Sequence, residues 1–210
     1  MIKHRKRKCK SCDKMCYTPL CTTCKNKLKK KPVKKTAKKP STTKVKYPKT
    51  SILKKHAYDV FSLFVRLRDS NAEGNGKCIT CDRICFFYDD CAQNGHFRPR
   101  AKMSTTFHEQ NNNLQCSGCN GPGGGMYYEY GKALDIKYGK GSAEELDRKS
   151  KQEILKYGPL EYMEVIEKSL QNCDALLKKK KIYEDVKEKL NIRLNFYRRF
   201  LNKAIEKLEN

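Results

Sequence analysis

Eight of the twelve cysteines in this 210-residue chain fall into four pairs, each with two residues between the two cysteines. The pairs are Cys9–Cys12, Cys21–Cys24, Cys78–Cys81 and Cys116–Cys119. Two thiolates at this spacing can bind one zinc ion from a tight turn, and a second pair completes its tetrahedral shell. The four pairs therefore predict two structural zinc sites, one near the N-terminus and one in the middle of the chain.

The remaining cysteines are interpreted differently. Cys16 lies inside the first set and is a spare or substitute ligand there, whereas we expect Cys85, Cys91 and Cys173 to be ordinary small side chains. Buried thiols without metal are the alternative interpretation of both sets of four. Metal is favoured over disulfides because we expect an intracellular, soluble protein: the sequence shows no secretory signal and no apolar run of membrane-spanning length.

Positive charge is concentrated at one end of the chain. Residues 1–50 hold nineteen Lys and Arg and one acid, Asp13, so they carry most of the formal net charge of +24. Each Lys or Arg placed on a phosphate releases condensed counterions, which gives affinity without sequence preference. The arm is therefore expected to bind a polyanion such as DNA, and a solvated disordered tail is compatible with it before binding.

Composition shifts divide the chain into four expected parts. These are a zinc knuckle at 1–24, a basic linker at 25–50, a core at 51–150 and a helical region at 151–210.

Apolar residues at three- and four-residue steps predict several helices. One begins with Ser51 as its cap and ends near Asp69, and a second spans 126–137. Residues 142–145 have the form of a capping box that opens a third. The apolar stripes of residues 151–210 predict two long helices that pack as a hairpin or against a second copy of the chain.

The middle of the chain holds residues suited to phosphodiester hydrolysis. That reaction needs a water deprotonated near neutral pH and a cation that offsets charge in the transition state. His96 can act as the base, while Arg98 and Arg100 suit phosphate binding. An amide such as that of Asn111 can orient the histidine or bind a metal. A lone histidine is usually a core or surface residue, but the position of His96 between two cysteine pairs favours the catalytic interpretation.

The stretches that carry this chemistry resemble a known family. They are Gly95-His-Phe-Arg-Pro-Arg100, Phe107-His-Glu-Gln-Asn111 and Leu114-Gln-Cys-Ser-Gly-Cys-Asn120. They look like the HNH (ββα-metal) superfamily and, more narrowly, the phage NinG/Rap recombination nucleases. Those proteins are similar in having an N-terminal cysteine cluster, a basic linker, a helix before the central cysteines and a helical tail. The resemblance covers most of residues 1–150 and is strongest at 78–139.

The resemblance implies an α+β fold with a small zinc-stapled ββα-metal nuclease core, flanking helices, an N-terminal zinc ribbon or knuckle and a C-terminal helical hairpin. His96 then matches the general base, Asn111 the middle asparagine, and Asn120 the last metal-binding or phosphate-orienting residue. Mg²⁺ or Mn²⁺ would be the catalytic metal. The implied substrates are D-loops and Holliday junctions, with phage or host recombination proteins as partners in the cytoplasm of an infected host cell.

The sequence departs from the family pattern at two places. Many relatives carry an Asp shortly before the Gly-His pair, where this chain has Gln93 and Asn94, and many have a His where this chain has Asn113. The nearby carboxylates that could stand in for the Asp are Asp89, Asp90 and Glu109.

Three functions therefore remain open. The first is a structure-specific endonuclease for branched DNA, with the C-terminal helices supplying dimerisation or junction recognition. The second is a general HNH nuclease that nicks or cuts duplex DNA. The third is a non-catalytic zinc protein that binds nucleic acid, which the missing carboxylate keeps open.

Overall fold

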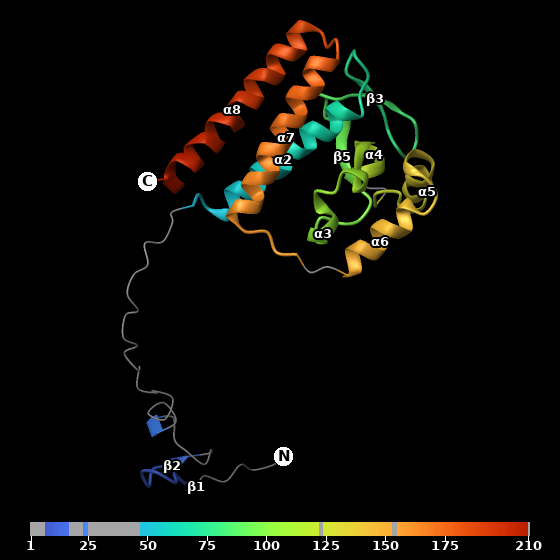
Figure 1. The fold of residues 1–210 in the computed structure, drawn as a ribbon. Coiled ribbons are helices and arrows are strands. Elements are labelled where there is room, and N and C mark those ends of the chain that lie inside the picture. Colours follow the sequence, from blue (N-terminus) through green and yellow to red (C-terminus); the bar gives the residue numbers. More distant parts are fainter. Residues whose placement is uncertain (1–6, 17–22, 25–46, 122–123, 153–154, 210) are drawn as a thin grey trace. The chain divides into compact units, whose positions relative to one another are not determined.

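The chain divides into two units, residues 1–44 and 45–210 (Figure 1). The computed structural model describes residues 7–16, 23–24, 47–121, 124–152 and 155–209. In the first unit, β1 (Arg7–Lys8) and β2 (Met15–Cys16) pair as a short antiparallel hairpin. Cys21 and most of the expected linker lie outside the described residues, so the predictions made for them stay predictions.

Three long helices form one layer of the second unit. They are α2 (Thr50–Arg68), α7 (Pro159–Lys179) and α8 (Glu184–Glu209). Figure 1 shows them side by side, with α7 and α8 joined as the helical hairpin that the sequence predicts. Their apolar residues recur at three- and four-residue steps, which gives each helix one apolar face, and these faces make a common core. Its buried members include Leu53, Ala57, Val60 and Phe64 of α2, Ile166 and Leu170 of α7, and Leu190, Leu194 and Leu201 of α8.

Two short antiparallel sheets lie beside this layer. β3 (Asn75–Lys77) pairs with β4 (Ile84–Phe86), and β5 (Ala92–His96) pairs with β6 (Asn112–Cys116). The segment between β5 and β6 holds α3 (Met103–Thr106) and a 3-10 turn, η1 (Glu109–Asn111). After β6 come α4 (Ser117–Asn120), α5 (Tyr127–Tyr138) and α6 (Ser142–Gln152). The unit is therefore α+β, as predicted.

A second, smaller core joins the β5–β6 hairpin to the helices that follow it. Phe97, immediately after β5, is buried with Tyr130 and Leu134 of α5 and Leu146 of α6. The hydroxyl of Tyr130 donates a hydrogen bond of 2.9 Å to the carbonyl of Gly95. These contacts hold α5 and α6 against the end of the hairpin that carries His96.

The last turn of α2 contacts both strands of this hairpin. Its side chains reach main-chain atoms, which positions the hairpin without depending on the identity of the strand residues. Arg66 donates a hydrogen bond of 3.4 Å to the carbonyl of Ala92 in β5, and Arg68 donates one of 2.7 Å to the carbonyl of Asn112 in β6. Asp69, directly after α2, accepts a hydrogen bond of 2.9 Å from the N–H of Leu114.

Lys180, one residue beyond α7, caps the C-terminal end of α2. Its ammonium group donates hydrogen bonds to the carbonyls of Leu67, Arg68 and Ser70. The last carbonyls of a helix have no partner within the helix, and a positive charge there also interacts favourably with the helix dipole. Lys180 thus ties the turn between α7 and α8 to the end of α2.

Two expected helix starts are corrected. The predicted cap, Ser51, lies inside α2, whose first residue is Thr50 and whose N-cap, Lys49, makes no side-chain cap hydrogen bond. Ser142 opens no capping box, because its hydroxyl donates to the carbonyl of Gly139 at 2.7 Å. The start of α6 is capped from α5 instead: Asp135 accepts the N–H of Ala143 at 3.0 Å.

Candidate metal centre and active-site residues

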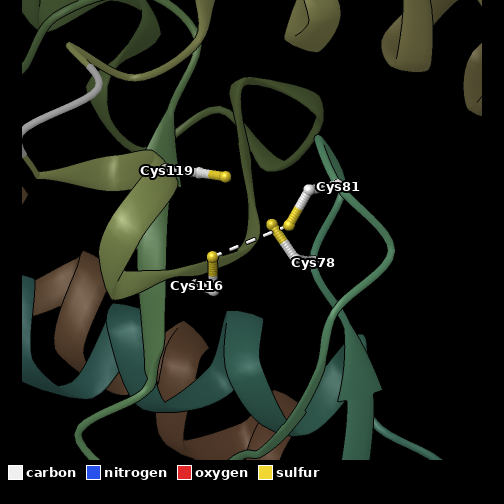
Figure 2. Close-up of side chains that lie close together, drawn as sticks. All are labelled: Cys78, Cys81, Cys116 and Cys119. Carbon is white, nitrogen blue, oxygen red and sulfur yellow. Dashed lines mark hydrogen bonds between the residues drawn. The ribbon is translucent and has the colours of Figure 1, made fainter.

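The four central cysteines converge, although two of them precede the β5–β6 hairpin, one is its last residue and one follows it. Cys78 and Cys81 lie in the turn between β3 and β4, while Cys116 ends β6 and Cys119 lies in α4. Their sulfur atoms all lie within 4.8 Å of one another (Figure 2). The sulfurs of Cys81 and Cys116 are 3.8 Å apart. This group could hold a metal ion such as zinc, and it would join the two sheets.

The donor set and its spacing fit zinc. With Zn–S bonds of about 2.3 Å in a tetrahedron, adjacent sulfurs are about 3.8 Å apart. The tight turn that presents Cys78 and Cys81 is closed by main-chain hydrogen bonds from Cys78 to Arg83 at 2.8 Å and from Asp82 to Cys78 at 3.0 Å.

Local hydrogen bonds favour the thiolate that zinc requires. Burial alone would raise the pKa of Cys78. Hydrogen bonds from the Thr80 hydroxyl and from the main-chain N–H groups of Cys116, Thr80 and Cys81 outweigh burial and lower this pKa to about 6. For Cys81, a main-chain hydrogen bond from Arg83 favours the thiolate, but burial and the neighbouring thiols outweigh it and raise its pKa. A divalent cation is the group that would let all four thiols ionise together.

A second cysteine group lies in the N-terminal unit. The sulfurs of Cys9, Cys12 and Cys24 lie within 4.8 Å of one another, and Cys9 is 3% exposed. The turn between Cys9 and Cys12 is closed by the hydrogen bond from the N–H of Cys9 to the carbonyl of Lys14 at 2.9 Å. These three residues could also hold a metal such as zinc. Cys21, the fourth expected ligand, is outside the described residues.

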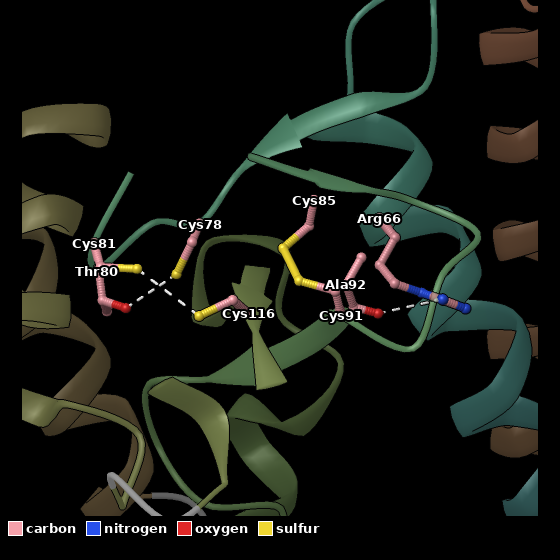
Figure 3. The surroundings of a disulfide bond; sticks show 8 residues. All are labelled: Arg66, Cys78, Thr80, Cys81, Cys85, Cys91, Ala92 and Cys116. Atoms are coloured by element: carbon pink, nitrogen blue, oxygen red, sulfur yellow. Dashed lines mark hydrogen bonds between the residues drawn. A yellow bond between two sulfur atoms is a disulfide. The ribbon is translucent and has the colours of Figure 1, made fainter. Parts of the chain in front are cut away.

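Cys85 and Cys91 correct an expectation, because they form a disulfide rather than standing as separate small side chains (Figure 3). The chain leaves β4 and enters β5 within a few residues, which brings their Cα atoms to 5.8 Å. Arg66 supports the loop between them by donating to the carbonyl of Phe87 at 2.9 Å. Cys85 is buried in the same cluster as Cys78 and Cys116, so the disulfide lies beside the candidate zinc site.

His96 is the last residue of β5 and is paired with Asn112 of β6. Burial, together with the positive charge of Arg100, lowers its pKa to about 4, although hydrogen bonds with the main chain of Asn94 and Thr106 act in the opposite direction. Its Nε2 atom is enclosed and has no hydrogen-bond partner among the described residues. The ring is therefore neutral at pH 7, with one nitrogen uncommitted within the described part of the chain.

Asn111 serves the main chain rather than the histidine ring. Its side-chain oxygen accepts the N–H of Arg98 at 2.7 Å, and its side-chain nitrogen donates to the carbonyl of Arg98 at 3.1 Å. Asn111 is fully buried, so this pair of bonds fixes the chain two residues beyond His96. It closes the segment that runs from β5 to β6.

Asn120 and the two arginines lie in different surroundings. Asn120, at the end of α4, donates to the side-chain oxygen of Gln93 at 2.7 Å. Arg98 forms an ion pair with Asp147 of α6, and its guanidinium lies 4.7 Å from the ring centroid of Tyr127. Arg100 is exposed, so it is the more accessible of the two arginines to a phosphate.

A buried polar network, which the sequence pattern does not reveal, supports the β5–β6 hairpin. Asn113 is fully buried. Its side-chain oxygen accepts hydrogen bonds from Lys137 at 2.8 Å, Tyr138 at 2.8 Å and Arg68 at 3.3 Å. Asp69 joins the same network through Arg68 and Lys137. The sequence around Asp69 does not indicate this role, because its partners lie up to 68 residues away along the chain.

None of the acids expected near His96 forms a ligand group with it in the described ranges. Within them, the groups of three or more His, Cys, Asp or Glu that could hold a metal are the two cysteine groups. Asp89, Asp90 and Glu109 are exposed and belong to neither group. The expected catalytic Mg²⁺ or Mn²⁺ therefore has no carboxylate ligand set among these residues.

No family model matches this chain, and neither does any curated protein or solved structure. Of the helices in the described ranges, none combines the length and apolar character that crossing a membrane requires.

Proposed function

We propose that this protein is an HNH-type endonuclease that hydrolyses phosphodiesters of branched DNA, with His96 as the general base. The observation that carries the proposal is the position of His96. It ends the first strand of an antiparallel hairpin whose second strand ends at Cys116 and leads directly into α4, which holds Cys119. A zinc ion on the four central cysteines would fix this hairpin from its open end. The resemblance of the sequence to the NinG/Rap nucleases supports the same assignment.

The protonation state of His96 suits a base. A general base must be unprotonated when it meets its proton donor, and a pKa of about 4 keeps the ring neutral at pH 7. In the proposed step, a ring nitrogen of His96 takes a proton from water while the water oxygen bonds to phosphorus. The bond from phosphorus to the leaving sugar oxygen breaks, and that oxygen takes up a proton from solvent water. A phosphate beside Arg100 would offset the positive charge that depresses this pKa, so the base would strengthen when DNA binds.

A divalent cation, Mg²⁺ or Mn²⁺, would offset charge on the phosphate when bound. Because the described acids form no ligand set beside His96, we assign this cation no protein ligand and derive no step through it. The basic N-terminal arm supplies affinity for any DNA, whereas branch selectivity comes from shape rather than from base identity.

The test is cleavage of labelled linear duplex, D-loop and four-way-junction DNA with Mg²⁺ or Mn²⁺. His96→Ala is expected to slow cutting by about 100- to 10,000-fold, the usual contribution of general-base catalysis. The matched control is His108→Ala, because His108 is a half-buried histidine on the same segment but outside β5. The proposal requires His96→Ala to keep its zinc content, its circular dichroism spectrum and its DNA affinity. Loss of any of these would assign His96 a structural role.

The same experiment separates two other functions. Cutting of all three substrates at similar rates would indicate a general HNH nuclease. A non-catalytic zinc protein that binds DNA is favoured by one observation, the lack of a carboxylate ligand set beside His96 in the described ranges. Tight binding without any cutting, in either metal, would establish that alternative.

A further inference from the structure

Two adjacent tyrosines stand exposed at the start of α5. The side chain of Tyr127 is 50% exposed and that of Tyr128 is 66% exposed. Large aromatic side chains on a surface usually serve an interface, since their burial on binding is favourable and costs little conformational entropy. The hydrophobic core of the unit does not require Tyr128, because the residue of this turn that it buries is Tyr130.

Tyr127 is coupled to the strand that carries His96. Its ring stacks on that of Phe97, with ring centroids 4.6 Å apart and planes inclined by 9°. Phe97 is buried and directly follows His96. A base stacked on this pair of tyrosines would therefore be held close to the end of β5.

A cation lies beside each ring, and the cation beside Tyr127, Arg98, is also ion-paired with Asp147. The guanidinium of Arg98 lies 4.7 Å from the centroid of Tyr127, and the ammonium of Lys132 lies 4.1 Å from that of Tyr128. Aromatic faces beside Lys or Arg are the usual surface for single-stranded nucleic acid, because the rings stack on bases while the cations attract the phosphates.

We propose that Tyr127 and Tyr128 form a stacking platform for unpaired bases, and that this platform selects branched DNA over linear duplex. The inference rests on the proposed nuclease function only for the choice of branched DNA as the ligand, because stacking of bases on the tyrosines involves no reaction. Bases within a duplex are already stacked on one another and cannot reach the platform. Bases next to a branch can open towards it.

The probe is a DNA fork carrying 2-aminopurine in its unpaired strand, mixed with zinc-loaded full-length protein and no added Mg²⁺ or Mn²⁺. Stacking of 2-aminopurine on a tyrosine quenches its fluorescence. Tyr128→Ala is expected to abolish part of this quenching and to weaken fork binding about 10-fold, while leaving binding to linear duplex unchanged. Tyr128→Phe, which keeps the ring, should bind and quench like the wild type.

The matched control is Tyr183→Ala, since Tyr183 is 60% exposed but lies just before α8. Equal fork binding and quenching by Tyr128→Ala and wild type would overturn the platform. Equal weakening on fork and linear duplex would also overturn it, because a general electrostatic surface explains that result. Quenching without any cutting when Mg²⁺ is added would leave the platform standing and refute the nuclease. Cutting of DNA by a protein whose fork binding is unaffected by Tyr128→Ala would refute the platform and leave the nuclease standing.

Discussion

Asp69 connects the end of α2 to β6 and to α5 through its carboxylate. The carboxylate has a side-chain exposure of 9%. It accepts two hydrogen bonds of 2.9 Å from Arg68, one of 3.0 Å from Lys137 and one of 2.9 Å from the main-chain N–H of Leu114. Burial alone would raise the pKa of Asp69, but these contacts outweigh it and lower the pKa below its ordinary value.

The expected magnitude follows from this geometry. Removing one partner of a buried ion pair leaves the other charge uncompensated and costs about 3–5 kcal/mol. Asp69→Ala strands the guanidinium of Arg68, which is largely buried, so we expect a loss of about 3–5 kcal/mol in the free energy of unfolding. Asp69→Asn keeps the shape and one acceptor oxygen, so its loss should be smaller.

The pH dependence of stability gives an independent check of the direction in which the pKa of Asp69 is shifted. A carboxyl whose folded pKa is lowered stabilises the fold fully above its unfolded pKa of roughly 4, and loses this contribution as pH falls through the folded pKa. The stability difference between wild type and Asp69→Asn should therefore be constant near neutral pH and shrink below about pH 4. Because both proteins carry the same cysteines, acid-induced loss of metal affects both curves.

The measurement is urea-induced unfolding of zinc-loaded wild type, Asp69→Asn and Asp69→Ala, followed by circular dichroism from pH 7 downwards. Glu188→Ala is the control, because Glu188 is an exposed acid within α8. A loss below about 1 kcal/mol for Asp69→Ala would refute the argument, since that is the range of a surface pair. A difference that grows on acidification would refute the assigned direction of the pKa shift.

Two further predictions concern the metal and the cap of α2. Cys116→Ser should lower the zinc content by one ion per chain as measured by elemental analysis, whereas Cys173→Ser, which changes a buried cysteine of the helical core, should not. Retention of full zinc content in Cys116→Ser would contradict the central site. Lys180→Met removes the cap on the last carbonyls of α2 and should cost roughly 1–3 kcal/mol of unfolding free energy. An unchanged urea midpoint would show that water satisfies those carbonyls equally well.

Features that depend on local spacing could be predicted from the sequence. The helices α2, α7 and α8 follow from apolar residues at three- and four-residue steps, and the two cysteine groups follow from their two-residue spacing. Helix starts were less predictable. Ser142 has the sequence of a capping box, but Asp135 of the preceding helix accepts the N–H of Ala143 and caps α6 instead.

Features that depend on distant partners could not be predicted. The role of Lys180 rests on carbonyls more than a hundred residues earlier, and nothing in a run of four lysines distinguishes it from its neighbours. Asn111 could be singled out, but not its bonds to the main chain of Arg98. The Cys85–Cys91 disulfide was missed because a separation of six residues matches no zinc spacing and the intervening loop sets the approach.

The hydrogen bonds between the end of α2 and the β5–β6 hairpin restrict which movements the second unit can make. Arg66 and Arg68 hold the carbonyls of one residue on each strand, and Asp69 holds an N–H of β6. A slip of β5 by one residue would break the bond to Ala92, and a slip of β6 would break those to Asn112 and Leu114. Either slip would turn the side chains of that strand to the opposite face. These bonds therefore hold the hairpin against α2 in one register. Any rearrangement that admits a bulky ligand to His96 therefore has to occur in the segment between the strands, residues 97–111. The side chain of Asn111 joins the two ends of this segment through its hydrogen bonds to the main chain of Arg98.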